Sequence, residues 1–244
     1  MGLKDDIINK AKEIEAAEFK VEEITTVPTI DTPKLTFGCT GLEFEATVLY
    51  IDMRGSTPML NKHRKRIVAK IHMIYYHAIV KIAKATGGEI RSFNGDSLLV
   101  FYQGTTKVAL SNAVKAAMQM RYAITNLVND KLKSYTDIDF GIGIDYGKIL
   151  ATKVGVGGID TTKDIIWIGN AVNKSTVISD KCKNPNYIGI SKVVYDNLED
   201  NVKYGTRKNY WDQDERVDMW TQCYFTYNGS TDIYYYTSWY WPIN

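Results

Sequence analysis

The 244-residue sequence has little cysteine, little net charge and no long hydrophobic run. Its three cysteines, Cys39, Cys182 and Cys223, lie far apart and form neither a CxxC pair nor a zinc-ligand spacing. This excludes a disulfide-stapled scaffold or a zinc module and suits a reducing compartment. No window approaches about 18 apolar residues, and the charged N-terminal segment lacks the apolar stretch of a signal peptide. We therefore expect a cytoplasmic protein that makes no membrane contact.

Basic and acidic residues nearly balance, with 30 lysines and arginines against 28 acids and a net charge of +2. Proteins that coat DNA or RNA rely on a strongly positive surface, so we expect no nucleic-acid partner. Hydrophobic residues make up 45% of the chain, which is ordinary for a globular protein and excludes a disordered one. A chain of this length buries enough surface to fold without a disulfide or a structural metal.

The composition divides the chain into three parts. Residues 1–40 are predicted to form an amphipathic helix over residues 3–20 and then an extended linker over residues 22–33, which contains two prolines. Residues 41–200 alternate strand and helix patterns and are predicted to form the main domain. Residues 201–244 are rich in aromatic side chains and alternate as strands do, so we expect additional strands packed on the same domain.

The main domain is predicted to have an α+β, ferredoxin-like β-α-β-β-α-β core, in which two helices cover one face of the sheet. Thr57, just before Pro58, is expected to cap the first helix, and an Asn-Gly pair marks a hairpin turn. Tyr146–Gly147 is expected to be a turn that returns the chain as a further strand. In chain order the predicted elements are the strand Ala46–Met53, the helix Thr57–Ala85, the strands Glu89–Phe93 and Ser97–Tyr102, the helix Gln103–Val128, the strands Asp137–Asp145, Lys148–Lys153 and Ile165–Ile168, the helix Asn170–Asp180, and a short strand and helix within Tyr187–Leu198.

Two acids stand where neighbouring strands end. Asp52 lies near the end of the first strand, and Asp96 lies at the tip of the hairpin. Carboxylates at adjacent strand ends can share hard cations, and paired metals stabilise both oxygens of an in-line phosphoryl displacement. The glycine-bearing turn Met53–Thr57 leads into a helix and would offer backbone N–H groups to phosphates. Each acid alone is explained by a helix cap or a turn, but the two acids and this turn together favour a metal and phosphate site.

Four segments between Phe44 and Leu198 resemble, in order, the blocks typical of class III nucleotide cyclases. VLYIDMRGST resembles the first metal block of that family, and GGEIRSFNGDSLLVFY resembles the second. FGIGIDYGKILATKVG is similar to the dimer-hairpin block, and WIGNAVNKSTVIS is similar to the helix that carries the ribose-orienting Asn. The resemblance implies a homodimer with active sites at the subunit interface, a nucleoside triphosphate substrate, and two divalent metal ions, Mn²⁺ or Mg²⁺, per site.

The resemblance also implies roles for individual residues. Asp52 and Asp96 would bind both metal ions, and the carbonyl of Met53 would help to bind one of them. The ribose 3′-hydroxyl would attack the α-phosphate and expel pyrophosphate, with the ribose oriented by Asn173 from the other subunit. The residues whose amides would hold the β- and γ-phosphates are Gly55, Ser56 and Thr57.

Three positions depart from the pattern of purine cyclases. Ser92 stands where those enzymes place Lys or Glu, and Ile166 stands where they place Asp, Thr or Cys. A hydroxyl and an aliphatic group cannot supply the usual purine-edge contacts, and unpaired polar groups on a base are costly. Tyr50 replaces the common Phe and suits a smaller, stacked and hydrogen-bonded base. These departures resemble the Pycsar uridylate cyclases of bacterial anti-phage defence. They imply conversion of UTP to 3′,5′-cyclic UMP, a messenger for a separate downstream effector.

A fourth departure concerns the rate of the chemical step. The transition-state Arg of the family is Val177 here, and arginines in comparable sites contribute about 10³–10⁵ in rate. Lys174, Arg54 or a cation of the C-terminal segment is a candidate substitute. The alternatives are a cytidylate cyclase that makes cyclic CMP from CTP, a purine cyclase with an unusual pocket, and a catalytically inactive, nucleotide-binding homologue that regulates a partner.

Overall fold

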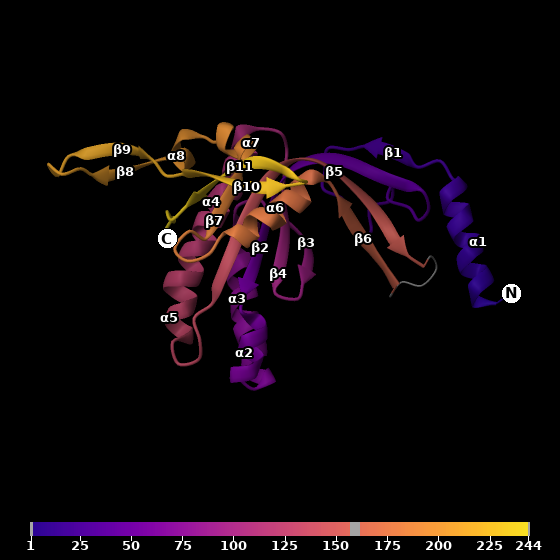
Figure 1. The fold of residues 1–244 in the computed structure, drawn as a ribbon, viewed down its shortest axis with the longest axis horizontal. Helices are drawn as coiled ribbons and strands as arrows, with labels where there is room; N and C mark the ends of the chain where they lie inside the picture. Colours follow the sequence, from indigo (N-terminus) through magenta and orange to yellow (C-terminus); the bar gives the residue numbers. More distant parts are fainter. Residues whose placement is uncertain (1, 157–161, 244) are drawn as a thin grey trace.

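The computed structural model describes residues 2–156 and 162–243 (Figure 1). In chain order its elements are α1 (Leu3–Ala16), β1 (Lys20–Glu23), β2 (Thr40–Arg54), α2 (Ser56–Lys62), α3 (Lys65–Ala85), β3 (Glu89–Asn94), β4 (Ser97–Gln103), α4 (Lys107–Tyr122), the π-helix η1 (Ala123–Val128), α5 (Asn129–Leu132), β5 (Asp139–Gly155), β6 (Lys163–Ile168), α6 (Asn170–Lys181), β7 (Ile188–Ser191), α7 (Lys192–Asp196), α8 (Asp200–Lys203), β8 (Tyr204–Lys208), β9 (Asp214–Asp218), β10 (Thr221–Tyr227) and β11 (Ser230–Thr237). Within the described ranges, none of these helices is both long and apolar enough to cross a bilayer.

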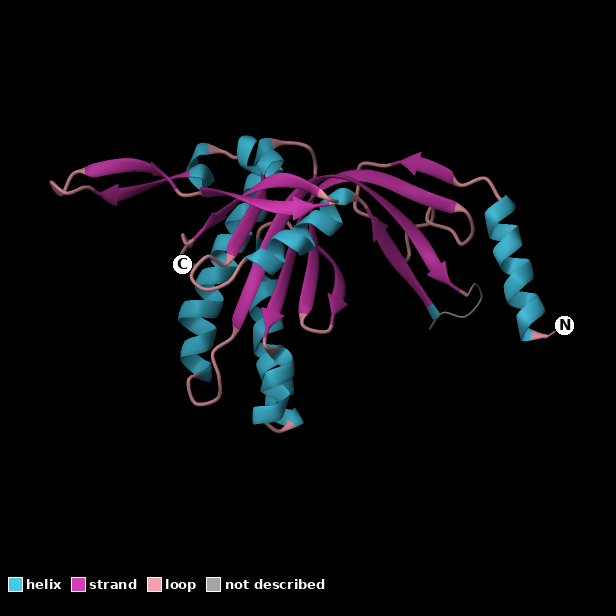
Figure 2. Ribbon diagram, in the orientation of Figure 1, coloured by secondary structure: helices cyan, strands magenta, loops and turns pink. Residues whose placement is uncertain are grey.

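Nine strands form one mixed sheet, in the order β10-β11-β7-β5-β2-β4-β3, with β1 added beside β2 and β6 beside β5 (Figure 2). Its central part, β5-β2-β4-β3, has antiparallel neighbours throughout and reproduces the predicted ferredoxin-like core. The α+β fold class is therefore confirmed. The aromatic C-terminal hairpin β10–β11 continues the same sheet through β7, whereas β8 and β9 form a separate two-stranded ribbon.

The predicted turn at Tyr146–Gly147 is wrong, because β5 passes through these residues without interruption. Tyr146 pairs with Thr47 and Gly147 pairs with Ala46 in one antiparallel ladder between β5 and β2. Since β2 runs for 15 residues, it supplies hydrogen-bonding partners on both sides of the expected turn. The distal half of β5 pairs with β6 and forms, with it, a long arm that we call the β5–β6 arm (Figure 1).

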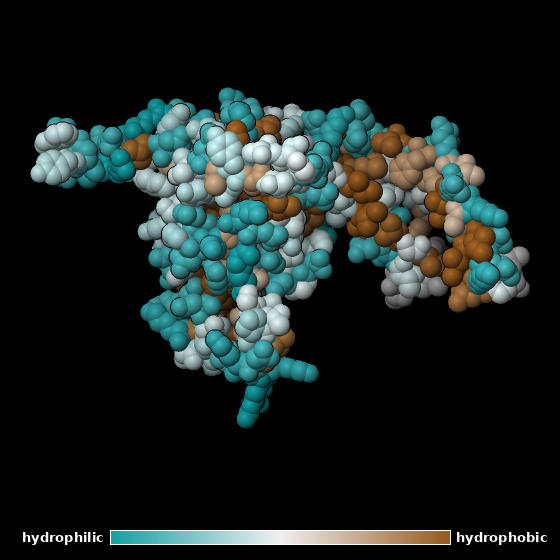
Figure 3. Space-filling view, viewed as in Figure 1, coloured by the Kyte–Doolittle hydropathy of each residue, from teal (hydrophilic) through white to brown (hydrophobic). Residues whose placement is uncertain are grey.

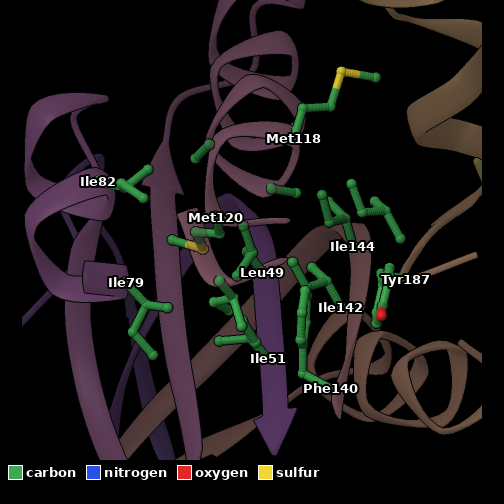
Figure 4. Packing of buried hydrophobic residues seen from close by; sticks show 14 of the residues in the cluster. Leu49, Ile51, Ile79, Ile82, Met118, Met120, Phe140, Ile142, Ile144 and Tyr187 are labelled. Atoms are coloured by element: carbon green, nitrogen blue, oxygen red, sulfur yellow. The ribbon is translucent and has the colours of Figure 1, made fainter. Parts of the chain in front are cut away.

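The largest hydrophobic core lies between one face of the sheet and the helices α3 and α4. Figure 4 shows Leu49 and Ile51 of β2 beside Ile142 and Ile144 of β5, in the region where α4 contributes Met120. The alternation of side chains along a strand places these residues on one face. The residues between them therefore face the opposite side of the sheet, where the functional groups lie.

Helix α6 covers that opposite face of β5 at unusually close range. A Cβ atom at Gly141 would overlap the carbonyl oxygen of Ser179, and one at Gly143 would overlap that of Ser175. The Ser179 hydroxyl donates a hydrogen bond to the Gly141 carbonyl at 2.9 Å. Backbone of the helix thus rests directly on backbone of the sheet, which only glycine allows.

The single long helix predicted after the first strand is two helices. The chain is extended at His63 and Arg64, between α2 and α3. Four of the five residues at positions 62–66 are lysine or arginine, and like charges within one helical turn repel each other. The expected cap at Thr57 is also wrong, because Gly55 occupies the cap position and Pro58 is the third helical residue.

Two further boundaries differ from the prediction. The helix expected from Gln103 begins only at Lys107, where the Thr106 hydroxyl accepts from the Ala109 amide at 3.3 Å, and its last six residues are η1. The segment predicted as a linker is partly structured, because β1 pairs with β2 in parallel. Val27 is buried in a second apolar cluster on the same side of the sheet as α6. By contrast, α1 buries none of its side chains.

The glycine contact between β5 and α6 generates a stability prediction. Gly143→Ala should lower the free energy of unfolding by about 2–3 kcal/mol, because the methyl group must displace helix backbone. Gly147→Ala is the matched control, since its Cβ would lie 3.6 Å from the Ala171 Cβ, an ordinary contact. Urea denaturation of both variants measures the difference. Equal stability of the two would contradict the close-packing account.

Candidate active site

The two predicted acids lie together at one end of the sheet. Asp52 pairs with Ser97 in the ladder between β2 and β4, and Asp96 precedes Ser97 in the hairpin turn. The Met53 amide donates to the Asp96 carbonyl at 3.2 Å, which ties the end of β2 to the hairpin tip. The pairing of both acids at adjacent strand ends follows from the strand–turn pattern of the sequence.

The carboxylates influence each other electrostatically. Burial, the largest cause, and the neighbouring Asp96 carboxylate raise the pKa of Asp52 to about 6, against the opposing effect of Arg54. Two carboxylates that share a partly desolvated position repel each other when both are ionised. A divalent cation bound between them relieves that repulsion, so the electrostatics suit a metal ligand pair.

The donor set fits a nucleotide-bound metal better than a structural one. In residues 2–156 and 162–243, no group of three or more His, Cys, Asp or Glu side chains gathers into a metal cage. Mg²⁺ usually keeps several waters and is bound by one or two carboxylates together with substrate phosphates. Asp52, Asp96 and the Met53 carbonyl match that kind of coordination.

The turn after Asp52 presents backbone donors beside the acids. Gly55 has φ +74°, a left-handed conformation that glycine adopts without strain, and it starts α2. Ser56 and Thr57 are the first residues of that helix, so their amides have no intrahelical partner. All three residues are exposed or half-buried, on the open side of the turn.

Arg54 connects this turn to α6. Its guanidinium donates to the Ser179 carbonyl at 2.5 Å and to the Cys182 carbonyl at 3.0 Å, at the C-terminal end of the helix. A cation at this end of a helix also interacts favourably with the helix dipole. Arg54 therefore anchors α6, which argues against it as the substitute for the missing transition-state Arg.

Two of the three predicted base-contacting residues lie next to the acids. Tyr50 and Ser92 both pair with Leu99 of β4, so they flank it on the same face of the sheet. Tyr50 lies two residues before Asp52 on β2 and shares its face. Both side chains are half-buried. Tyr50, Ser92, Asp52 and Asp96 thus form one continuous surface.

Ile166 lies far from this surface. It pairs with Thr152 on the β5–β6 arm, and the adjacent Ala151 pairs with Leu42 at the beginning of β2. The distance from Leu42 to Asp52 along β2 corresponds to roughly 30 Å of extended strand. The Ile166 side chain is 41% exposed. Within one subunit, Ile166 therefore cannot contact a nucleotide held by Asp52.

Asn173 is exposed on α6, and within the described residues its side chain makes no hydrogen bond. Val177, one turn further along, packs against a small apolar cluster of α6 and the C-terminal hairpin. Its side chain is occupied in packing rather than directed at the acids. The structure thus brings Asp52, Asp96, Tyr50 and Ser92 together and leaves Ile166 apart from them.

Sequence reasoning missed a tyrosine that holds the hairpin. The Tyr76 hydroxyl of α3 donates to the Gly95 carbonyl at 2.9 Å and to the Ser97 carbonyl at 3.1 Å. Burial, followed by the charge of Asp96, raises the pKa of Tyr76 to about 12, so the hydroxyl remains a donor at neutral pH. No local pattern marks Tyr76, because its partners lie on an element folded against α3 from elsewhere in the chain.

The Arg54 contact predicts a loss of stability on substitution. Arg54→Met should lower the free energy of unfolding by about 2 kcal/mol, because two carbonyls at the helix end lose charge-assisted hydrogen bonds. Arg207→Met is the control, since its pair with Glu215 at 3.4 Å is exposed and should contribute less than about 0.5 kcal/mol. Chemical denaturation measures both. An Arg54→Met protein as stable as Arg207→Met would refute the anchoring role.

Comparisons with known proteins identify the family and the fold. A uridylate cyclase from Xanthomonas perforans is 29% identical over 249 residues and covers 100% of both chains. A uridylate cyclase from Burkholderia cepacia is 27% identical and covers 91% of this chain and 96% of its own. The crystal structure of the guanylyl cyclase Cya2 shares the fold, with a TM-score of 0.65, 19% identity, and coverage of 81% of this chain and 93% of its own. The family described as the adenylate and guanylate cyclase catalytic domain matches residues 43–224, and the chain belongs to that family.

Proposed function

We propose that this nucleotide cyclase converts UTP to 3′,5′-cyclic UMP and pyrophosphate in a metal-dependent homodimer. The observation that carries the proposal is the division of the site. One end of the sheet gathers Asp52, Asp96, Tyr50 and Ser92, while Ile166, the third predicted base-contacting residue, lies beyond their reach in the same chain. A second copy of the chain is the natural source of the missing half.

The chemistry assigned to this site is an internal phosphoryl transfer. The 3′-oxygen of the ribose forms a bond to the α-phosphorus, the bond from that phosphorus to the β-phosphate bridging oxygen breaks to release pyrophosphate, and the 3′-hydroxyl proton passes to solvent water. Divalent ions bound to the nucleotide would supply charge neutralisation at the attacking and leaving oxygens. Asp52, Asp96 and the Met53 carbonyl would hold those ions.

The remaining residues orient the substrate. The amides at the start of α2 would donate to the β- and γ-phosphates, and Asn173 from the other subunit would fix the ribose. Positioning of this kind supplies much of the rate in phosphoryl transfer, since holding reacting atoms in line removes an entropic barrier.

The β5–β6 arm supports the dimer. Figure 3 shows hydrophobic residues gathered on the surface of this arm. On β6, Ile166 is 41% exposed and Ile168 is 51% exposed, and Val156, directly after β5, is 59% exposed. Exposed apolar patches of this kind mark contact surfaces. A second subunit seated on the arm would bring Ile166 and Asn173 to the acids and cover the patch.

Two observations support a pyrimidine base in the substrate. Tyr50 and Ser92 offer one aromatic ring and two hydroxyls beside the acids, which suits a small base better than a purine. Two relatives that cover nearly the whole chain are named uridylate cyclases. We propose UTP over CTP on this second ground. We further propose a cytoplasmic enzyme whose product signals to a separate effector in anti-phage defence.

An inactive, nucleotide-binding regulator is the second candidate, and the surroundings of Val177 favour it. Val177 is half-buried in the apolar cluster, and the two candidate substitutes named by residue are both engaged, Arg54 by helix carbonyls and Lys174 by Asp232. Retention of both acids and Asn173 favours the enzyme.

An assay of the purified protein separates these functions. The four ribonucleoside triphosphates are incubated singly with Mn²⁺ or Mg²⁺, and products are identified by mass spectrometry. We expect cyclic UMP from UTP as the main product. Cyclic CMP as the main product would move the assignment to CTP, and a preferred purine triphosphate would refute the pyrimidine pocket. Binding of a triphosphate without any cyclic product would establish the inactive homologue.

The metal assignment predicts loss of turnover in two variants. Asp52→Ala and Asp96→Ala should each lower kcat by about 10³-fold or more, equivalent to about 4 kcal/mol of transition-state stabilisation. Asp130→Ala removes a surface carboxylate paired with Lys133 and serves as the control with unchanged kcat. Size-exclusion chromatography checks that the variants remain folded. Turnover that persists in either acid variant would exclude that residue as a metal ligand.

A further inference from the structure

The C-terminal hairpin β10–β11 contacts α6 at Asn170 and at Lys174, which lie before and after Asn173 in the sequence. The Lys174 ammonium donates to the Asp232 carboxylate at 2.7 Å, and both side chains are largely shielded from solvent. The Tyr227 hydroxyl lies 3.3 Å from the side-chain oxygen of Asn170, and the Tyr227 ring faces the Lys174 ammonium at 5.0 Å. Asn170 and Lys174 are four residues apart on the helix, so these contacts lie on one side of it.

Helix α6 and the hairpin also make an apolar contact further along the helix. Val177 packs against a cluster formed by two residues of the C-terminal end of α6 and two aromatic residues of the hairpin, namely Ile178, Cys182, Phe225 and Tyr234. On its other side, α6 rests on the backbone of β5 at Gly143. The helix is therefore held between β5 and the hairpin, and a rotation of the helix would break its contacts with one of them.

We propose that Asp232 and Tyr227 are positioning residues that set the direction in which Asn173 projects toward the nucleotide bound by the partner subunit. The inference rests on the proposed function, because it assumes that Asn173 acts across the dimer. Asn173 makes no side-chain hydrogen bond within the described residues, so its direction is set by the orientation of α6. A misplacement of about 1 Å in such a group can cost about 10²-fold in rate.

Lys174 has a different role in this account from a transition-state cation. Lys174 acts through its ion pair with Asp232, so Lys174→Met and Asp232→Ala should lower kcat to a similar extent. The double variant should then be no slower than either single variant, since the two groups form one interaction. A Lys174→Met protein much slower than Asp232→Ala would overturn the positioning role of Lys174.

The first test measures steady-state kinetics of Asp232→Ala and Tyr227→Phe. We expect kcat to fall by about 10- to 100-fold with little change in KM, because the triphosphate is held by the other subunit. Tyr227→Phe keeps the ring and removes only the hydroxyl, so it tests the contact without a cavity. Asp214→Ala, which removes an exposed pair with Lys208 in the β8–β9 ribbon, is the matched control. Unchanged kcat in both test variants would refute the proposal.

The second test assigns Asp232 to one half of the site by mixing subunits. Heterodimers of Asp52→Ala and Asn173→Ala chains should regain about half of the wild-type activity, since one intact site forms. Heterodimers of Asp232→Ala with Asp52→Ala should regain activity in the same way. Heterodimers of Asp232→Ala with Asn173→Ala should not, because both defects lie in the same half.

The reverse complementation pattern would place Asp232 with the metal ligands and would overturn the inference. Recovery with neither partner, together with a lowered melting temperature, would make Asp232 a residue of general stability and would also overturn it. Failure of the proposed function gives a different result: no cyclic product from the wild-type protein, or no recovery when Asp52→Ala is mixed with Asn173→Ala.

Discussion

The seating of α6 on the backbone of β5 determines where Arg54, at the end of β2, and the C-terminal hairpin meet the helix. Gly141 and Gly143 have no side chain at the point where the helix backbone meets the sheet, and the Ser179 hydroxyl donates a hydrogen bond to the Gly141 carbonyl. Once the helix is seated there, its C-terminal end meets Arg54 and its outer side meets the C-terminal hairpin. The end of β2 and the C-terminal hairpin are thereby both held against the helix that carries Asn173.

The sequence predicted those parts of the fold that depend on local signals. The Asn-Gly pair and the apolar runs on each side located the hairpin with Asp96, and the buried run before Asp52 located its strand. Tertiary pairing overrode the turn signal at Tyr146–Gly147, because β2 continues to supply partners there. The break at His63 was hidden because the helical apolar pattern continues on both sides of it.

The candidate site was predictable only in part, for a related reason. Asp52, Asp96, Tyr50 and Ser92 sit on adjacent strands whose register follows from the hairpin, so the sequence order brings them together. The contacts of Tyr76, Arg54 and Lys174 join residues that are distant in the chain, the last pair from α6 to the C-terminal hairpin. No spacing rule links such pairs, so only the folded chain reveals them.

The contact between Arg54 and α6 has a consequence for the proposed homodimer. Arg54 is the last residue of β2, two positions after Asp52, and its guanidinium donates hydrogen bonds to carbonyls at the C-terminal end of α6. The contact therefore ties the end of β2, two residues after Asp52, to the helix that carries Asn173. In the proposed homodimer, Asp52 and Asn173 of one subunit serve different active sites, so this contact joins parts of both sites within a single chain.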